Sequence, residues 1–372
     1  MSRKALITGG AGFVGSHLAD ELLNHGYQVR ALDNLSEQVH GPNPRRPEYL
    51  NDEVELIRGD VRDSVAVRRA LAGIDVVFHL AASVGVGQSM YQIADYTDSN
   101  GMGTAVFLQE LMERPVERVV VASSMSIYGE GFYRDKAGRL ISPNERKISQ
   151  LKVRDWEVRD GSGEPLIPIP TNETKCPALP SVYAISKYYQ ERLCMTVCPA
   201  YGMEAVGLRF FNIYGSRQAL SNPYTGVLAI FASRFLNNKP PLINEDGRQQ
   251  RDFVSVQDIA RACRLAMERT AAAGEVFNIG SGRAFSILEI AERMAAVLNK
   301  ENLEPRITGK YRVGDIRNCF ADISKARRLL QYEPRVQLDE GLEDLAEWLE
   351  GQIAIDHVDA AQEELEARGL AV

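Results

Sequence analysis

A tyrosine and a lysine four residues apart are the first groups whose spacing suggests chemistry. Tyr183 and Lys187 end the run Tyr-Ala-Ile-Ser-Lys, so on a helix they share one face. A free phenol has a pKa of about 10, and a nearby ammonium group lowers that pKa by favouring the phenolate. The pair could therefore act as a base near neutral pH, although helices also place tyrosine beside lysine on ordinary solvated surfaces.

A serine at the end of a predicted strand could join the tyrosine and the lysine as a third functional group. Ser124 closes a Ser-Ser pair that directly follows the apolar run Val119–Ala122. That run has the pattern of a buried strand, and parallel α/β sheets bind their ligands where the strands end. Ser124, Tyr183 and Lys187 are therefore the predicted catalytic residues, a set that could move a proton to and from a substrate hydroxyl.

A glycine-rich turn follows the first apolar run and precedes a helical pattern. Such a turn lets a pyrophosphate approach the backbone at the positive end of a helix. Asp33 ends the second apolar run, 18 residues after Gly15, where a carboxylate can accept both ribose hydroxyls. This carboxylate would repel a 2′-phosphate and no arginine follows it closely, so NAD is predicted rather than NADP. The predicted residues of the turn are Gly9, Gly12, Phe13, Val14 and Gly15.

The ends of the next strands supply further candidates for binding the cofactor. A carboxylate at the end of the third strand could meet the adenine amine, and small residues after the fourth would allow close approach. His79, beside the latter, is interpreted as a packed strand residue rather than a base. The candidates are Asn34, Asp60, Val61, Leu80, Ala81 and Ala82.

Apolar runs alternate with segments of helical periodicity through the first half of the chain. The predicted strands are Ala5–Thr8, Val29–Asp33, Val54–Arg58, Val76–Leu80 and Val119–Ala122, and the predicted helices are 13–25, 64–72 and 97–113. Runs at 205–211 and 276–279 look like later strands of the same sheet. This order predicts an α/β fold: a doubly wound parallel (Rossmann) sheet with a smaller, sequence-discontinuous α/β substrate-binding lobe.

We expect three parts along the chain. Residues 1–212 form a cofactor-binding domain to which the strand 276–279 returns, and residues 213–350 form most of the substrate-binding lobe, including a helix at 339–349. Residues 131–180, rich in charge and proline, are predicted to cross the surface as a polar insertion. Residues 351–372 form a charged tail for which the sequence offers no partner.

Composition restricts the classes of function. The 372 residues carry 43 basic and 50 acidic side chains, a net charge of −7, which argues against a nucleic-acid binder. No stretch of about 18 apolar residues could cross a membrane, and the N-terminal apolar run is too short for a signal peptide, so a cytoplasmic protein is expected. The five cysteines have no zinc-binding spacing, and no metal site is predicted.

These motifs together resemble those of the extended short-chain dehydrogenase/reductase family, in particular its nucleotide-sugar epimerases. The resemblance covers roughly residues 3–350 and includes the glycine turn, Tyr183 with Lys187, and the motifs at 123–129, 209–215 and 251–253. It implies that Tyr183 is the base, that Lys187 lowers its pKa and binds the nicotinamide ribose, and that Ser124 binds the reacting sugar hydroxyl. It also implies that Asn100 belongs to the cofactor site.

The residues after the catalytic serine separate the reactions of this family. Its dehydratases carry an Asp-Glu pair there and its decarboxylases typically keep a glutamate, whereas this chain has Met125 and Ser126. The resemblance therefore disfavours loss of water or CO₂ and leaves a 4-epimerisation, in which C4 is oxidised and hydride returns to the opposite face.

The same resemblance implies a site for a nucleotide-diphosphate sugar. Guanidinium groups suit phosphate because they stay charged and bind bidentately, although an arbitrary arginine is more often a surface residue. Cys319 stands where related epimerases limit the size of the sugar, and ordinary packing is an equally good interpretation. The implied substrate-binding residues are Ser124, Ser126, Asn212, Arg251, Arg312, Asp315 and Cys319.

The block 218–227 and the insertion look like those of bacterial dTDP-L-rhamnose 4-epimerases, which makes dTDP-L-rhamnose the leading substrate. Some relatives carry paired cysteine and histidine in the insertion, and residues 131–170 here contain neither, so the resemblance gives no case for zinc. UDP-glucuronate or UDP-galactose epimerisation is the alternative, and a catalytically silent NAD-binding scaffold is an alternative of another class. The resemblance also implies a homodimer through the helices around 97–113 and 183–198.

Overall fold

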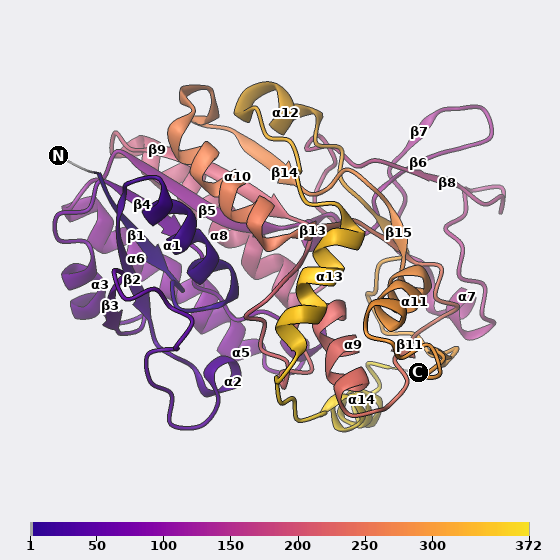
Figure 1. Cartoon of the computed structure of the whole chain (residues 1–372). Coiled ribbons are helices and arrows are strands. Elements are labelled where there is room, and N and C mark those ends of the chain that lie inside the picture. Colours follow the sequence, from indigo (N-terminus) through magenta and orange to yellow (C-terminus); the bar gives the residue numbers. More distant parts are fainter. Residues whose placement is uncertain (1–2, 372) are drawn as a thin grey trace.

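A seven-stranded sheet forms the centre of the computed structural model, which describes residues 3–371 (Figure 1). Its strand order is β14-β9-β5-β4-β1-β2-β3, and every neighbouring pair is parallel. The predicted doubly wound sheet is confirmed, and the late strand 276–279 joins it at one edge. The strands are β1 (Lys4–Thr8), β2 (Gln28–Asp33), β3 (Glu55–Arg58), β4 (Val76–His79), β5 (Arg118–Ser124), β9 (Glu204–Phe210) and β14 (Val276–Ile279).

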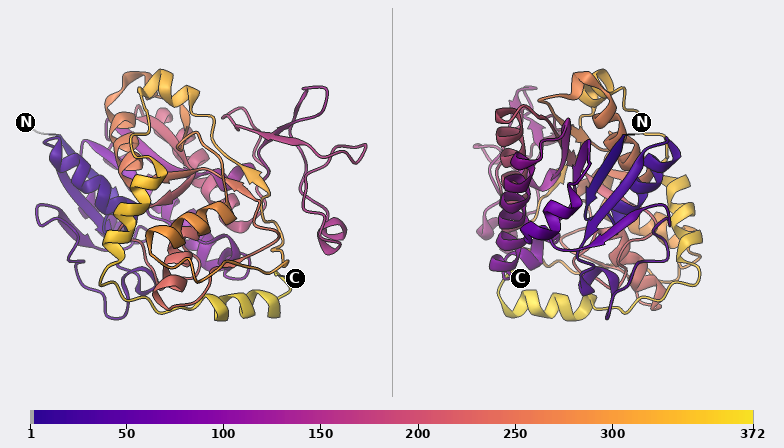
Figure 2. Two further views of the ribbon diagram at one scale, coloured as in Figure 1. Left: turned by 45° about the vertical axis from the view of Figure 1, so that its right-hand side comes forward. Right: turned by 90° about the vertical axis from the view of Figure 1, so that its left-hand side faces the viewer.

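Helices cover both faces of this sheet because successive strand side chains point to opposite sides. In β1, Ala5 and Ile7 join one apolar cluster and Leu6 joins the other. The first cluster contains α1 (Phe13–Asn24), α10 (Val256–Glu268) and α12 (Ser324–Leu330), and the second contains α3 (Ser64–Ala70), α6 (Gly103–Glu113) and α8 (Val182–Ala200). The two layers lie on either side of the strands in Figure 2. Within the residues described, no helix is long and apolar enough to cross a membrane.

The smaller lobe has an apolar cluster of its own, built on three helices. It is sequence-discontinuous, as predicted, because α10 and β14 interrupt it and pack with the central sheet. Its elements are β10 (Asn212–Tyr214), α9 (Val227–Leu236), β11 (Leu242–Ile243), β12 (Gln250–Arg251), β13 (Phe253–Ser255), β15 (Phe285–Ser286), α11 (Ile287–Val297), β16 (Arg306–Ile307), β17 (Asn318–Cys319) and α13 (Leu338–Leu349).

Short elements complete the chain. The predicted helix 97–113 is split, because a π-helical turn occupies Thr97–Met102 before α6 begins. The remaining elements are α2 (Glu37–His40), α4 (Val86–Ser89), α5 (Ile93–Tyr96), 3₁₀ turns at Met125–Tyr128 and Thr270–Ala272, β6 (Phe132–Arg134), β7 (Leu140–Ile141), α7 (Ile148–Lys152), β8 (Ile167–Ile169) and α14 (Val358–Ala367).

The insertion 131–180 contains an antiparallel sheet in the order β7-β6-β8, and the chain after β8 leads to α8. The sheet projects from the body of the protein on the side of the smaller lobe (Figure 2). Its base is anchored, because Gly131 donates its N–H to the carbonyl of Asn318 (2.8 Å) and Thr171 forms a β-bridge with Ala321. The side chain of Arg146 is only 3% exposed. The expectation that this segment merely crosses the surface is therefore wrong for its base, which packs into the smaller lobe.

The C-terminal tail also has partners that the sequence did not reveal. Helix α14 lies along one side of the molecule, below α9 in the view of Figure 1. After it, Leu370 accepts a hydrogen bond from the N–H of Val313 (3.0 Å). The guanidinium of Arg368 stands 4.4 Å from the ring centre of Tyr91. The tail, for which the sequence offered no partner, contacts both the smaller lobe and a loop of the sheet domain.

Candidate active site

The glycine turn at the carboxyl end of β1 leaves room for a ligand at the start of α1. Gly9 has a φ of +72°, which favours glycine, and donates its N–H to Leu32 (2.8 Å). A Cβ on Gly15 would lie 2.2 Å from the carbonyl oxygen of Gly9. Gly12 caps α1 without a side chain, so no side-chain oxygen competes for the N–H groups of the first turn, which Phe13 and Val14 begin. This arrangement fits a pyrophosphate.

The acidic residues predicted to meet the adenosine lie next to this turn. Asp33, 8% exposed, accepts hydrogen bonds from the N–H groups of Ala11 (3.0 Å) and Leu35 (2.8 Å). Asn34 donates its amide to Asp60 (3.0 Å), which joins the ends of β2 and β3. Hydrogen bonds from Arg62 lower the pKa of Asp60 to about 2, so this carboxylate is ionised at neutral pH. This arrangement would accommodate a ribose and an adenine beside the glycine turn.

The loop after β4 is held in place by Asn100. The loop contains Leu80, Ala81 and Ala82, and a Cβ on Gly9 would lie 3.0 Å from the backbone nitrogen of Ala81. Asn100 is fully buried and binds both the N–H (2.7 Å) and the carbonyl (3.0 Å) of Ser83. Its amide also donates to Ser186 of α8 (2.9 Å). Direct cofactor binding by Asn100 is therefore not what the structure supports, because its amide is used within the protein to position the loop.

Ser124 and Tyr183 meet at the carboxyl edge of the sheet. β5 ends at Ser124, whose hydroxyl accepts the N–H of Ser126 (3.2 Å). Tyr183 lies in the first turn of α8, and its N–H donates to the hydroxyl of Ser89 in α4 (3.0 Å). Burial raises the pKa of the Tyr183 phenol, and a hydrogen bond with Ser124 opposes this rise. The two hydroxyl groups therefore form the predicted pair.

Lys187 is buried and faces a network of neutral side chains. Its ammonium donates to Gln190 (2.7 Å), whose amide donates to Thr104 (2.9 Å). Burial lowers the pKa of Lys187 to about 8. The predicted lowering of the Tyr183 pKa by Lys187 is not seen, because burial dominates the phenol and the ammonium is turned toward Gln190. A positively charged nicotinamide ring would add the stabilisation of the phenolate that Lys187 does not supply.

His79 belongs to the same network and is a packed strand residue, as predicted. Its ring nitrogens lie 2.9 Å from the hydroxyls of Thr8 and Thr104, and the ring stacks on Phe107 with centroids 4.7 Å apart. Burial lowers the pKa of His79 to about 3, so the ring is neutral. Sequence reasoning missed Gln190, because a glutamine three residues after a lysine carries no recognisable signal.

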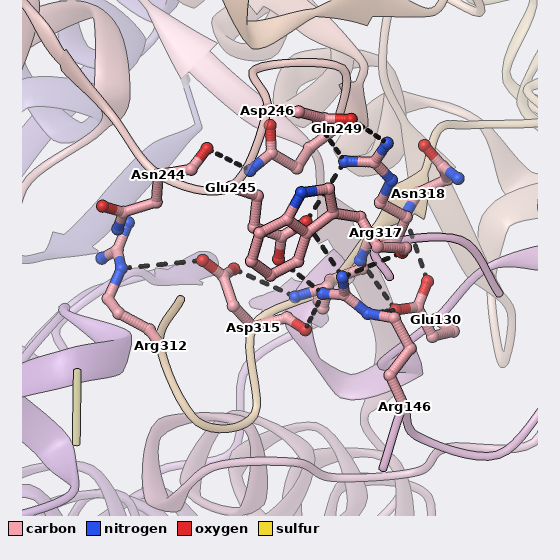
Figure 3. A network of polar contacts seen from close by, with 12 residues as sticks. Glu130, Arg146, Asn244, Glu245, Asp246, Gln249, Arg312, Asp315, Arg317 and Asn318 are labelled. Atoms are coloured by element: carbon pink, nitrogen blue, oxygen red, sulfur yellow. Dashed lines mark hydrogen bonds and ion pairs between the residues drawn. The ribbon is translucent and has the colours of Figure 1, made fainter. Parts of the chain in front are cut away.

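Three of the predicted substrate residues converge in the smaller lobe, and Figure 3 shows two of them, Arg312 and Asp315. Arg251 and Arg312 each place a guanidinium nitrogen 3.6 Å from a carboxylate oxygen of Asp315. Burial alone would raise the pKa of Asp315, but Arg312, Arg251 and Arg146 together hold it below its usual range. Arg251 also donates to the carbonyl oxygens of Arg317 (3.0 Å) and Ile316. Two guanidinium groups at one carboxylate form a cationic site suited to a diphosphate.

The other predicted substrate-binding residues differ in their burial and in their hydrogen-bond partners. Asn212 lies at the start of β10, and its amide oxygen is buried without a hydrogen-bond partner. The hydroxyl of Ser126 has only a distant contact with the sulfur of Met125 (3.9 Å). Cys319 is 1% exposed within the main apolar cluster. The structure therefore favours ordinary packing of Cys319, and its role in limiting the sugar pocket stays a prediction.

The comparisons with known proteins agree with this geometry. Residues 5–151 and 160–280 match the NAD dependent epimerase/dehydratase family. The chain belongs to this family. A dTDP-L-rhamnose 4-epimerase of Burkholderia thailandensis is 33% identical over 351 residues, which cover 93% of this chain and 95% of the relative. The prediction of an enzyme of the epimerase class is confirmed.

Solved epimerase structures have the same fold. A UDP-glucuronic acid 4-epimerase from Bacillus cereus, in complex with UDP-glucuronic acid and NAD, is 30% identical, with a TM-score of 0.76 over 94% of this chain and 99% of that chain. A UDP-glucose 4-epimerase from Thermus thermophilus, in complex with NAD, is 28% identical, with a TM-score of 0.74 over 94% and 100%. The prediction of NAD as the cofactor is confirmed, and the glycine turn with Asp33 would hold its adenosine and pyrophosphate.

The variant Gly12→Ala tests whether this glycine is required for NAD binding or for the stability of the fold. Gly12 has a φ of −77°, and a Cβ there would meet only the Gly9 carbonyl, at 3.4 Å. We expect the free energy of unfolding without NAD to change by less than about 1 kcal/mol, because alanine tolerates this backbone. NAD affinity should fall by about tenfold or more, because the methyl group occupies the approach to the backbone.

Calorimetric titration with NAD and chemical denaturation would measure the two quantities for Gly12→Ala. Gly161→Ala is the control, since a Cβ there would meet nothing within 4 Å. Unchanged NAD affinity in Gly12→Ala would contradict the assignment of this turn to the pyrophosphate.

Lys187→Met should stabilise the NAD-free protein, because burial of an ammonium costs free energy that methionine does not incur. The folded pKa of about 8 lies below the unfolded value of about 10.4, so stability rises with pH between them and the cost is constant below pH 8. We expect a gain of about 1–2 kcal/mol at pH 7 after allowing for the lost bond to Gln190, and a flatter pH dependence above pH 8.

Urea denaturation at pH 7 and at about pH 9.5 measures both effects. Lys136→Met is the matched control, because Lys136 is 73% exposed and forms only a surface ion pair with Glu164. Loss of stability in Lys187→Met at pH 7, with the control unchanged, would show that the ammonium is stabilised in the fold.

Proposed function

We propose that this chain catalyses the reversible 4-epimerisation of a nucleotide sugar, with dTDP-L-rhamnose and dTDP-6-deoxy-L-talose as the substrate pair. The observation that carries the reaction type is the meeting of Tyr183 and Ser124 at a sheet edge that has Met125 and Ser126 where a carboxylate would serve elimination. The similarity to the dTDP-L-rhamnose 4-epimerase of Burkholderia thailandensis supports the choice of sugar.

The proton steps are assigned to Tyr183 and Ser124. Ser124 binds the C4 hydroxyl of the sugar, and Tyr183 as phenolate accepts its proton, directly or through Ser124. Bound NAD would supply the hydride acceptor and donor for C4. Lys187 holds a positive charge beside this site and Gln190 fixes its position (2.7 Å). Burial raises the Tyr183 pKa in the cofactor-free protein, and a bound nicotinamide ring with its positive charge would favour the phenolate.

The substrate must also turn over without leaving. Arg251 and Arg312 bind the diphosphate by charge-assisted hydrogen bonds. With the nucleotide anchored there, the 4-keto sugar rotates and presents its other face, so the returned hydride inverts C4. Asn212, at the start of β10, is assigned to the diphosphate side, where its amide N–H groups would donate to a phosphate oxygen.

A UDP-sugar is the second candidate substrate. The Bacillus cereus UDP-glucuronic acid 4-epimerase is 30% identical and covers 94% of this chain. The motifs assigned here to proton transfer and phosphate binding would serve either nucleotide.

We also propose a homodimer through α6 and α8. Ile185 and Tyr189 share one face of α8 and are 52% and 47% exposed, and Met102, just before α6, is 56% exposed. Exposed apolar side chains gathered on neighbouring helices are typical of protein interfaces. A cytoplasmic location stays a prediction from the sequence.

The substrate is tested by incubating the purified protein, without added cofactor, with dTDP-L-rhamnose, UDP-glucuronate, UDP-galactose and UDP-N-acetylglucosamine separately. NMR of the sugar protons should show the C4 epimer from dTDP-L-rhamnose. Tyr183→Phe should lower kcat by about 10²–10⁴-fold, because the proton acceptor is lost. Tyr189→Phe, on the exposed face of the same helix, should keep full activity.

The alternatives give different outcomes. Conversion of a UDP-sugar would keep the mechanism and overturn the dTDP-sugar assignment. If none of the sugars is converted even with added NAD, the protein with bound NAD is better explained as a silent binder, and the proposed activity fails.

A further inference from the structure

Four charged side chains are buried together where the insertion meets the smaller lobe. Glu130 lies in the loop after β5 and Arg146 lies in the insertion (Figure 3). Glu245 and Arg317 belong to the smaller lobe. Each of these side chains is 1–3% exposed. We call this cluster the buried quartet.

Arg146 makes the most directional contacts of the buried quartet. Its two terminal nitrogens bind the two carboxylate oxygens of Glu245 at 2.7 and 2.9 Å. The same nitrogens donate to the carbonyl oxygens of Trp156 (3.1 Å) and Asp315 (3.1 Å). One guanidinium from the insertion thus holds the backbone of the residue whose carboxylate faces Arg251 and Arg312.

Glu130 completes the grip on the same loop. One of its oxygens accepts the N–H of Arg317 (2.7 Å) and the other accepts that of Asn318 (3.1 Å). The Arg317 guanidinium in turn binds Asp246 (2.6 Å) and Glu157 of the insertion (2.7 Å). Residues 315–318 are therefore fixed by charged groups on both sides.

The loop fixed in this way carries the groups that aim the cationic site. The carbonyl oxygens of Ile316 and Arg317 receive the guanidinium of Arg251. Asp315 lies 3.6 Å from both Arg251 and Arg312. A shift of this loop would move both predicted phosphate ligands together.

Stability alone does not explain a buried guanidinium at this place. Replacing buried ion pairs by apolar residues of similar volume is often neutral or stabilising, so what charge adds is a defined geometry. The side chain of Arg146 is 3% exposed, and besides Glu245 it contacts Glu130 and the carbonyl oxygens of Trp156 and Asp315, the last of which belongs to the substrate loop.

We propose that Arg146 is a positioning residue for the nucleotide-diphosphate part of the substrate, so that the insertion is part of the binding machinery rather than a surface addition. This inference rests on the proposed function, since it concerns how that substrate is bound. Through the carbonyl of Asp315, Arg146 sets where Arg251 and Arg312 present their charge.

Arg146→Lys is the variant of choice, because lysine keeps the charge opposite Glu245 and lacks the planar fork that binds two carboxylate oxygens and two carbonyls at once. Arg139→Lys is the matched control, from the same insertion but 78% exposed and paired only with Asp135. The probes are dTDP and UDP, bound without turnover, together with hydrogen exchange of the amides of 312–318 and steady-state kinetics with the converted sugar.

We expect Arg146→Lys to weaken binding of the nucleoside diphosphate about tenfold and to raise KM similarly, with kcat within about twofold and NAD affinity unchanged. Amides of 312–318 should exchange faster in Arg146→Lys and not in Arg139→Lys. This split is not what a merely structural role predicts, because general destabilisation would affect NAD binding and kcat as well.

Two results would overturn the inference while leaving the proposed function intact. One is wild-type nucleotide affinity in Arg146→Lys, whatever happens to amide exchange. The other is an equal loss of NAD and nucleotide affinity, which would make Arg146 a structural residue only. Failure of the wild-type protein to bind either nucleotide would instead overturn the proposed function itself.

Discussion

A polar stripe buried along α8 is the constraint on which the rest of the site depends. A buried polar group without a partner costs free energy, so this helix can dock on the sheet only where every member of the stripe is satisfied. Glu191 binds the guanidinium of Arg209 on β9 through both oxygens, at 2.8 and 2.9 Å. Ser186 and Gln190 bind Asn100 and Thr104. Docking in this register places Tyr183 beside Ser124 and leaves Lys187 buried behind them.

The smaller lobe is constrained in the same way, because its buried charged groups also need partners. Its cationic site would repel itself if Arg251 and Arg312 were not held at Asp315, and Asp315 is held in turn by the buried quartet. The tail adds a further restraint, because Ala371 forms a β-bridge with Arg312 and Leu370 binds Val313 (3.0 Å). The two halves of the site are thus positioned independently, one by the α8 stripe and the other by insertion and tail.

The sheet and the glycine turn could be predicted because their signals are local. Short continuous apolar runs identify the buried strands, and a Cβ on Gly15 would collide with Gly9 within the same turn. The spacing of Tyr183 and Lys187 is also local. Gln190, Arg146 and the tail were missed because each acquires its role from a residue distant in the chain. Asn100 and Cys319 were assigned to ligands from their motif positions. The structure adds that Asn100 binds Ser83 in the loop after β4 and that Cys319 is 1% exposed, and no local pattern encodes either fact.

We propose that one pocket removes the hydride from C4 of the sugar and returns it to the same carbon. The most direct measurement is conversion of dTDP-L-rhamnose deuterated at C4 in ordinary water, followed by mass spectrometry and NMR of both epimers. The account predicts that the deuterium stays at C4 of the epimerised product, because Tyr183 exchanges only the hydroxyl proton. Replacement of the deuterium by hydrogen from water during epimerisation would contradict it.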